Sequence, residues 1–321
     1  MIRRRDMLIA TAATLGPGLV RGQSAGNAFV VSGFPPGGMG DMVARPLTEK
    51  LRGRYAESLM LDSRPGAGGR IAVEYVKRAA PDGKTILQIP GSIMSLYPHI
   101  YSKLPYDPVA DFQPVSTLCG YVYSFTAGPG LPAEIKTVAD YIAWARANPK
   151  QALYGIPAAG SALHFAGMML QRSAKFEFNS VPYRGGAPLL QDLLGGQVQV
   201  YFGSFSLVIE HIRAGKLRVL AVTTPTRFES LPDIPTVGEF VPDYVASQWF
   251  AMGLRKNTPA EIIGRLNKEV DAVLTDAKIQ ARLADLGTTM FRGSPAELGI
   301  FIVEETEKWA KVVKFSGARP E

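Results

Sequence analysis

The chain has 321 residues, of which 46% are hydrophobic, so it can bury the cores of two domains or of one large one. Its formal net charge is +7, but a predicted leader at residues 1–22 contains four arginines and Asp6, and removing it leaves +4. No cluster of lysine and arginine alternates with aromatic residues, which argues against a nucleic-acid partner. The one cysteine, Cys119, cannot form an internal disulfide, and its apolar neighbours predict a buried, unreactive thiol.

Residues 1–22 have the pattern of an export signal. Several arginines precede a short apolar stretch at 7–15, and a small-residue exit follows at 20–22. The apolar stretch is too short to be a stable membrane anchor, so the pattern predicts a cleaved leader and a periplasmic protein. The pair Arg4 and Arg5 favours export by the twin-arginine route, although signals of the general secretion route also carry paired arginines.

Beyond the leader, strand-like and helix-like segments alternate, which predicts an α/β fold with mainly parallel, doubly wound sheets. The strand candidates are residues 29–32, 58–61, 85–89, 115–118, 121–127, 198–202, 217–223 and 248–252. The helix candidates are residues 41–52, 71–80, 138–148, 162–172, 187–194, 207–214, 259–274, 277–286 and 295–313.

Two proline-containing turns lie beside strands and are the best candidates for chain crossings between two lobes. They are residues 128–130 and 231–235. The predicted division is a first lobe of residues 27–125 and 236–321, interrupted by a second lobe of residues 126–235. In sheets of this kind a ligand binds outside the carboxyl ends of the strands.

A glycine-rich loop at residues 34–41 follows the first predicted strand. Its prolines end the strand, its glycines let the backbone approach a ligand, and Asp41 is placed to cap the next helix. Free N–H groups and the positive end of the helix dipole make such a loop a cradle for a carboxylate or phosphate. No Lys-Ser or Lys-Thr pair follows the glycines, which disfavours a nucleotide phosphate. An ordinary strand-to-helix turn is the alternative interpretation.

A second loop, residues 156–164, has the same character and follows a strand-like segment at residues 153–155. Small residues lead into a helix start, where Ser161 is placed to cap the helix and His164 follows in the first turn. Two such helix N-termini, one from each lobe, would hold one acidic ligand between them and couple its binding to closure. Capping and packing are the alternative roles of Ser161 and His164.

Neither catalysis nor a cofactor is indicated. Ser161 and His164 could touch on one helix face, but there is no G-x-S-x-G motif and no third residue placed to orient the histidine. The three histidines lie far apart in sequence and have no metal-binding spacing. We therefore expect a protein that is not an enzyme and that has no metal site and no cofactor.

A third cluster occupies residues 181–197. Its glycines open and close a predicted helix, so most of it is architectural. Tyr183 and Arg184 are the exceptions, because each could line a ligand site, although an exposed arginine is more often simply solvated.

In their order along the chain, these motifs resemble those of the solute receptors of tripartite tricarboxylate transporters, the Bug or TctC-like family of periplasmic binding proteins. The matching segments are residues 34–45, 64–69, 80–85, 104–108, 181–186 and 234–237. The resemblance extends from about residue 28 to the C-terminus. It implies a two-lobed, type II periplasmic-binding-protein fold with a ligand between the lobes.

The resemblance also implies that the loops matching residues 34–41 and 158–164 grip one carboxylate, largely through backbone N–H groups and ordered waters. Asp41 is expected to cap its helix and to order the loop or a water, since two anions would repel each other. The predicted ligand-binding residues are Phe34, Pro36, Gly37, Gly38, Asp41, Ala159, Gly160, Ser161, His164 and Tyr183, with Ser92, Ser204 and Phe205 at the far end of the ligand.

The second loop departs from the pattern of the resembling family. That family usually has serine and glycine where this chain has Ile156 and Ala158. An apolar residue near the cradle would favour an aromatic or aliphatic carboxylate over a polyhydroxylated one such as citrate. This preference is a hypothesis that rests on Ile156.

The expected function is that of a monomeric periplasmic receptor that delivers its ligand to the integral-membrane permease of a tripartite tricarboxylate transporter. The expected ligands are di- and tricarboxylates, aromatic acids and amino acids. A receptor subunit that reports a carboxylate to a signalling partner would use the same site and is the alternative. An exported hydrolase or isomerase is a more distant alternative, because it would need a catalytic pair that the sequence does not show.

Overall fold

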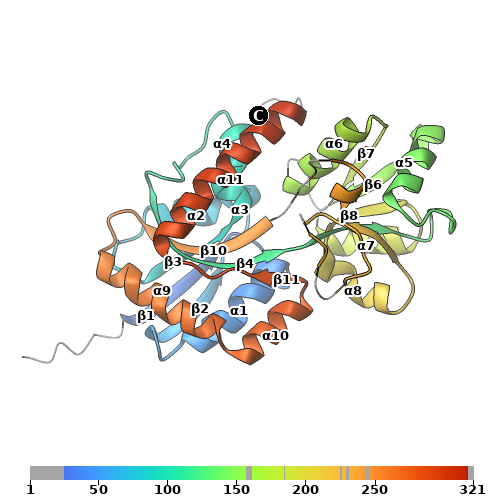
Figure 1. The fold of residues 1–321 in the computed structure, drawn as a ribbon. Coiled ribbons are helices and arrows are strands. Elements are labelled where there is room, and N and C mark those ends of the chain that lie inside the picture. The colour runs from blue at the N-terminus through green and yellow to red at the C-terminus, as the bar shows by residue number, and fades with distance from the viewer. Residues whose placement is uncertain are drawn as a thin grey trace, which may run out of the picture.

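The computed structural model describes residues 25–156, 161–183, 185–224, 226–228, 231–242, 244, 246 and 248–316. The predicted leader therefore lies outside the described residues. These ranges form two α/β lobes joined by extended strands, as Figure 1 shows. None of the helices in these ranges combines the length and the apolar character needed to cross a bilayer.

Lobe 1 has a six-stranded sheet with the order β11-β4-β10-β3-β1-β2. The strands are β1 (Ala25–Ser32), β2 (Ala56–Ser63), β3 (Thr85–Pro90), β4 (Phe112–Tyr121), β10 (Gln248–Arg255) and β11 (Thr288–Met290). Strand β1 is parallel to both of its neighbours, whereas β10 is antiparallel to β3 and β4. The sheet is therefore mixed, because β10 brings the chain back from the other lobe.

Seven helices of the described chain cover the two faces of this sheet (Figure 1). On one face are α1 (Met39–Leu51), α9 (Ala260–Leu274) and α10 (Ala277–Asp285), and on the other α2 (Arg70–Lys77), α3 (Gly91–Ser95), α4 (Tyr97–Ile100) and α11 (Pro295–Ser316). Both faces of β10 are consequently buried. Phe250 and Met252 pack toward α1 and α9, while Trp249 and Ala251 pack toward α3 and α11.

Lobe 2 has a five-stranded sheet with the order β7-β6-β8-β5-β9. Its strands are β5 (Tyr123–Ala127), β6 (Leu153–Ile156), β7 (Asn179–Pro182), β8 (Val200–Ser204) and β9 (Arg218–Val222). Its helices are α5 (Val138–Ala147), α6 (Ala162–Ala174), α7 (Gly186–Leu194) and α8 (Phe205–Arg213). Short 3-10 helices lie at Ala67–Gly69, Pro149–Gln151 and Val237–Glu239.

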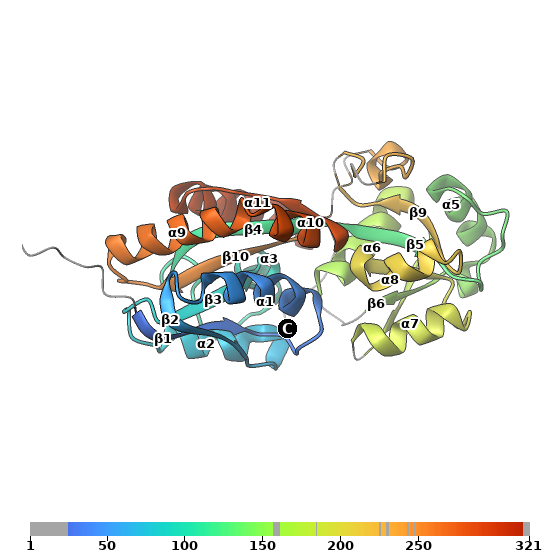
Figure 2. The same ribbon diagram turned by 90° about the horizontal axis from the view of Figure 1, so that it is seen from below.

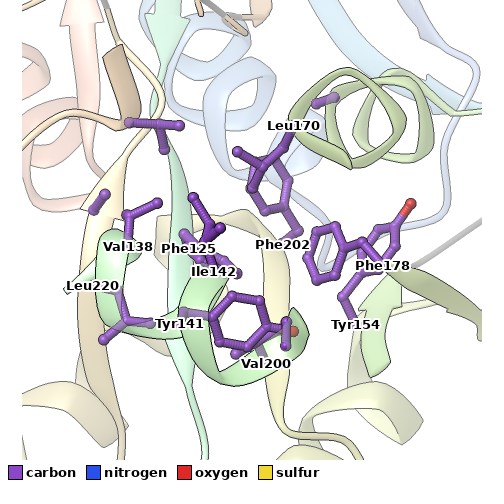
Figure 3. Close-up of a cluster of buried hydrophobic side chains, with 14 of the residues drawn as sticks. Phe125, Val138, Tyr141, Ile142, Tyr154, Leu170, Phe178, Val200, Phe202 and Leu220 are labelled. Atoms are coloured by element: carbon purple, nitrogen blue, oxygen red, sulfur yellow. The ribbon is translucent and has the colours of Figure 1, made fainter. Parts of the chain in front are cut away.

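The core of lobe 2 is built largely from aromatic rings (Figure 3). The Phe125 ring on β5 meets the Tyr141 ring of α5 edge to face, with 4.9 Å between their centroids. Tyr154 stacks on Phe178 at 3.9 Å, and Phe202 completes the cluster from β8. These rings fix the central strands of the sheet, and with them the carboxyl ends of β6 and β8.

The predicted two-lobed α/β fold is confirmed, and each predicted helix overlaps an observed one. The prediction of mainly parallel sheets is wrong, because β10 in lobe 1 and β5 in lobe 2 each run antiparallel to both of their neighbours. The sequence reading missed β7, β11, α3 and α4. The two strands lie at sheet edges, where one neighbouring strand supplies the pairing, so their own sequences carry little periodic signal. The two helices have five and four residues, which is too short for an amphipathic repeat.

The predicted positions of the two chain crossings are wrong. Strand β4 ends lobe 1 and β5 begins lobe 2 with only Val122 between them. The N–H of Val122 donates to the carbonyl of Gly287 at 3.1 Å, and its own carbonyl accepts from the N–H of Phe205 at 3.1 Å. The chain returns between Ala246, in the core of lobe 2, and Gln248, the first residue of β10.

Both predicted crossing turns belong to lobe 2 instead. The N–H of Gly128 bonds to Gln199, and a Cβ at Gly128 would lie 2.5 Å from the carbonyl of Leu193, so this turn is packed tightly on α7. Val237 and Val241, which follow the second turn, are buried in the core of lobe 2. Proline and glycine marked tight turns here, whereas the real crossing at Val122 joins two strands directly.

We predict that Phe202→Ala lowers the free energy of unfolding by about 3 to 5 kcal/mol, because it removes a ring that is fully buried in the lobe 2 cluster. Urea unfolding followed by circular dichroism measures this change. Phe315→Ala is the matched control, since Phe315 is 47% exposed and its loss should change stability by about 0.5 kcal/mol or less. Equal effects of the two substitutions would contradict the described core.

Candidate ligand-binding site

Four helices begin at the carboxyl ends of neighbouring parallel strands, two in each lobe. In lobe 1, β1 leads to α1 and β3 leads to α3, and in lobe 2, β6 leads to α6 and β8 leads to α8. This is the arrangement in which α/β sheets bind ligands, because helix N-termini and loop N–H groups gather at one edge. Of the predicted site residues that the structure describes, all but Tyr183 fall on these loops and helix starts.

The first loop is held in place by a side chain of the helix that follows it. Helix α1 begins at Met39, with Gly38 as its N-cap, so the prediction that Asp41 is the cap is wrong. Asp41 is instead the third residue of the helix, and its Oδ2 accepts from the N–H of Gly37 at 3.2 Å. Its Oδ1 accepts from Arg45 Nη2 at 2.5 Å. Asp41 thus orders the loop, as expected, and is already paired with a cation.

No side chain caps the N-terminus of α1. The N–H groups of its first turn also have no acceptor within the helix, because helix geometry leaves them without one. Pro36, Gly37 and Gly38 are exposed, so a ligand can approach these groups. Gly37 has a φ of +84°, which explains why a glycine stands there. The loop retains the features of an anion cradle.

Two contacts that the sequence did not predict hold this cradle in place. The buried Gln88 on β3 donates from Nε2 to the carbonyl of Gly40 at 2.8 Å. Gly33 lies against Gly69, and a Cβ on Gly33 would be only 2.6 Å from the Cα of Gly69. The half-buried ring of Phe34 also packs beside Gly69, so the glycine motif at residues 66–69 supports the first loop.

The start of α1 meets lobe 2 directly. The hydroxyl of Ser206 on α8 donates to the Met39 sulfur at 3.4 Å, and it lies 2.8 Å from the hydroxyl of Ser204. Ser204 is the N-cap of α8, and its side chain caps no N–H of that helix. Two helix N-termini without a side-chain cap therefore face each other across the lobes. Met39 and Ser206 were missed by the sequence analysis.

Phe205 does not fit its predicted place at the far end of a ligand. Its side chain is 2% exposed and lies against Gly287, where a Cβ would be 2.9 Å from its ring. Its N–H is used by the Val122 carbonyl. Phe205 therefore packs at the crossing of the chain. Ser92, by contrast, is half-buried in the first turn of α3, beside the first loop.

Helix α6 has a side-chain cap at its N-terminus. Ser161 is its N-cap, as predicted, and its hydroxyl accepts from the N–H of His164 at 3.4 Å. The His164 Nε2 lies 3.3 Å from the hydroxyl of Ser180. Burial lowers the pKa of His164 below 6.5, so the ring is neutral at pH 7 and provides no positive charge for an acid. Ala159, Gly160 and Arg184 lie outside the described residues.

Two further residues are engaged in packing. The hydroxyl of Tyr183 donates to Asp192 on α7 at 2.8 Å, and burial raises the pKa of Tyr183 to about 12. Ile156 has no exposed surface and belongs to the lobe 2 core. The hypothesis that Ile156 selects an apolar ligand is therefore not supported, because its side chain points into the core. The sequence could not show to which face of β6 the residue belongs.

The free cysteine has a structural place in the core of lobe 1. Cys119 is fully buried and its thiol pKa is raised to about 12 by burial, which confirms the prediction of an inert thiol. In the part of the chain that the structure describes, no group of three histidine, cysteine, aspartate or glutamate side chains is placed to hold a metal ion.

The fold and the paired helix starts define a two-lobed periplasmic binding protein. Residues 43–317 match the tripartite tricarboxylate transporter family receptors, and the chain belongs to this family. Its members are binding receptors rather than enzymes. The chain is 32% identical to the protein BugT of Bordetella pertussis over 319 residues, which cover 98% of this chain and 96% of BugT.

Solved structures of two proteins from Rhodopseudomonas palustris are closely similar. One is Rpa4515 with adipate, with a TM-score of 0.85 and 32% identity, covering 92% of this chain and 99% of that one. The other is MatC with bound malate, with a TM-score of 0.79 and 27% identity, covering 90% of this chain and 99% of that one.

We predict that His164 makes the folded protein less stable as the pH falls. Its folded-state pKa is lowered, so below about pH 6.5 the unfolded chain takes up a proton that the folded chain resists. His164→Gln should therefore flatten the dependence of unfolding free energy on pH between about pH 7.5 and about pH 5.5. Urea unfolding at the two pH values measures it.

Ser180→Ala is the control for this experiment, since it removes the hydroxyl beside His164 and keeps the titrating ring. The control should retain the slope of the parent protein. An unchanged slope in His164→Gln would show that another group carries the pH dependence.

Proposed function

We propose that this receptor captures a small carboxylate between its lobes and delivers it to the membrane permease of a tripartite tricarboxylate transporter. The observation that carries the proposal is the start of α1, which is exposed, has no side-chain cap and lies against Ser206 of the other lobe. An anion placed there would accept hydrogen bonds from the first-turn N–H groups and meet the positive end of the helix dipole.

Charge favours backbone recognition over recognition by a basic side chain. Arg45 is the cation beside the first loop, and Asp41 already pairs with it. A carboxylate at Gly38 is therefore held by N–H groups, whose fixed directions suit one anionic group and tolerate different chains attached to it. Bridging waters would add to this tolerance at small cost.

A dicarboxylate fits the facing helix starts best. Its first carboxylate would lie at the N-terminus of α1 and its second near Ser204 and Ser206 at the start of α8. Adipate and malate, which are bound to the two similar R. palustris proteins, are both dicarboxylates. The proposal therefore narrows the expected ligands from acids in general to short dicarboxylates.

Binding in this position would favour closure, because the two carboxylates join opposite lobes. The motion would occur at Val122 and between Ala246 and Gln248, where the chain passes between the lobes. The closed, monomeric receptor would be the form that the permease recognises. The leader at residues 1–22 would direct export to the periplasm, by the twin-arginine route if the paired arginines act as its signal.

We predict that adipate or malate raises the melting temperature of the mature protein, and that Gly38→Val removes this shift. A ligand at a hundred times its dissociation constant adds about 2.7 kcal/mol to the folded state. The added side chain should not disturb the fold, because φ is −82° at Gly38 and a Cβ would touch only the Pro35 carbonyl, at 3.6 Å. It would instead occupy the space above the helix start.

Gly264→Val is the matched control, since Gly264 lies on the exposed side of α9 with nothing within 4 Å of a Cβ. It should retain the full ligand-induced shift. If the ligand raises the melting temperature of a folded Gly38→Val protein as much as that of the parent, the first loop is not part of the site. If no short dicarboxylate raises the melting temperature of the parent protein, the proposed ligand class is contradicted.

A further inference from the structure

The helices α5, α6 and α11 end close together, and cations gather at their ends. Helix α11 ends against α6 (Figures 1 and 2), and Arg146 of α5 donates from Nη2 to the carbonyl of Ala174, the last residue of α6, at 2.6 Å. Three open hollows, of about 600, 380 and 480 Å³, lie among these ends. The five exposed cations that line them are here called the basic surface, and they are Arg146, Arg172, Lys175, Lys311 and Lys314.

The basic surface carries the net charge of the chain. Among the described residues that line the hollows, Glu177 is the one acid, so five cations and one carboxylate give +4. The chain without its predicted leader also has a net charge of +4, so the charges of the rest of the chain sum to zero. The negative ends of the three helix dipoles amount to about −0.5 each, which offsets less than half of this charge.

The cations of the basic surface have no carboxylate partner within the described chain. Ten other lysine and arginine side chains form ion pairs with described carboxylates. In the basic surface, Arg146 bonds to a backbone carbonyl, and the guanidinium of Arg172 lies 5.5 Å from the ring centroid of Phe315. The positive charges are therefore open to a partner outside this chain.

The spacing of these cations suits an acidic segment of another protein better than a small anion. They are exposed and distributed over three hollows, so they do not converge on one point. A single exposed ion pair contributes little, whereas a segment with several carboxylates pairs with several cations at once. Phe315 is 47% exposed beside Arg172, and exposed aromatic and arginine side chains are typical anchors of protein interfaces.

The basic surface also spans both lobes. Helix α11 is attached to lobe 1, where Glu305 accepts from Trp249 Nε1 at 3.1 Å. Its last turns pack on lobe 2, where Val313 shares a buried cluster with Phe165 of α6. A movement of one lobe against the other therefore changes the spacing between the cations of α11 and those of α5 and α6. A partner that contacts both groups distinguishes one arrangement of the lobes from another.

We propose that the basic surface is the docking site for an acidic periplasmic segment of the membrane permease. The inference rests on the proposed function, in which the permease receives the ligand from this receptor, and it adds the docking surface and the chemistry of the partner. Because the surface spans the lobes, the permease contacts all of it in one arrangement of the lobes. Docking and carboxylate binding then change each other's affinity by the same factor.

The test measures binding of the purified receptor to the permease of its transporter in phosphatidylcholine nanodiscs, by biolayer interferometry with adipate or malate present. The double variant Lys311→Glu with Lys314→Glu should bind at least tenfold more weakly than the parent, because two attractive charges become repulsive. Both side chains are exposed, so the variant should keep its melting temperature and its ligand-induced shift. Added salt should weaken binding of the parent more than binding of the variant.

The matched control is Lys268→Glu with Lys278→Glu. It reverses two exposed lysines of α9 and α10, which cover the opposite face of the lobe 1 sheet from α11. The control should bind the permease as the parent does. Empty phosphatidylglycerol nanodiscs test the membrane surface as the partner, and the parent should bind them more weakly than it binds the permease.

A Lys311→Glu and Lys314→Glu protein that binds the permease as tightly as the parent would overturn the inference. Equally tight binding of the parent to empty phosphatidylglycerol nanodiscs would also overturn it, because the surface would then serve the membrane. Failure of the proposed function gives a different result, in which the parent itself shows no melting shift with any short dicarboxylate or does not bind the permease at all.

Discussion

The first turn of an α-helix presents backbone N–H groups that the helix itself cannot satisfy, and in α1 no side chain satisfies them either. The surrounding residues hold this helix start rigidly and leave it open. Asp41 binds the Gly37 N–H from within the helix, Gln88 binds the Gly40 carbonyl from β3, and Gly33 fits closely against Gly69. The positive end of the helix dipole is thus prepared for an anion that the protein does not supply.

The strands that cross between the lobes bring the start of α8 in lobe 2 opposite the start of α1 in lobe 1. Strand β4 continues into β5 through Val122, whose backbone bonds to Gly287 on one side and Phe205 on the other. Because α8 begins at this point, its start is placed opposite Met39. Ligand capture and the arrangement of the lobes therefore both depend on the backbone at Val122 and on the start of α8.

The sequence predicted the two-lobed α/β fold, the longer helices and the first loop, because these depend on periodicity, glycine and proline. It did not predict which face of a strand a residue occupies or where the chain crosses between lobes. Phe205 was assigned to the ligand site and Ile156 was expected to influence the ligand preference, but both lie in packed regions, since burial is decided by partners distant in sequence. Gln88 and Ser206 were missed for the same reason, because their partners lie on other elements.

A crystal structure of the protein with a bound short dicarboxylate would test the account most directly. The account predicts one carboxylate within hydrogen-bond distance of the N–H groups of Gly38, Met39 or Gly40, and the other near Ser204 and Ser206, directly or through one water. A ligand whose carboxylates are held by arginine or lysine side chains elsewhere, with the start of α1 left to solvent, would contradict it.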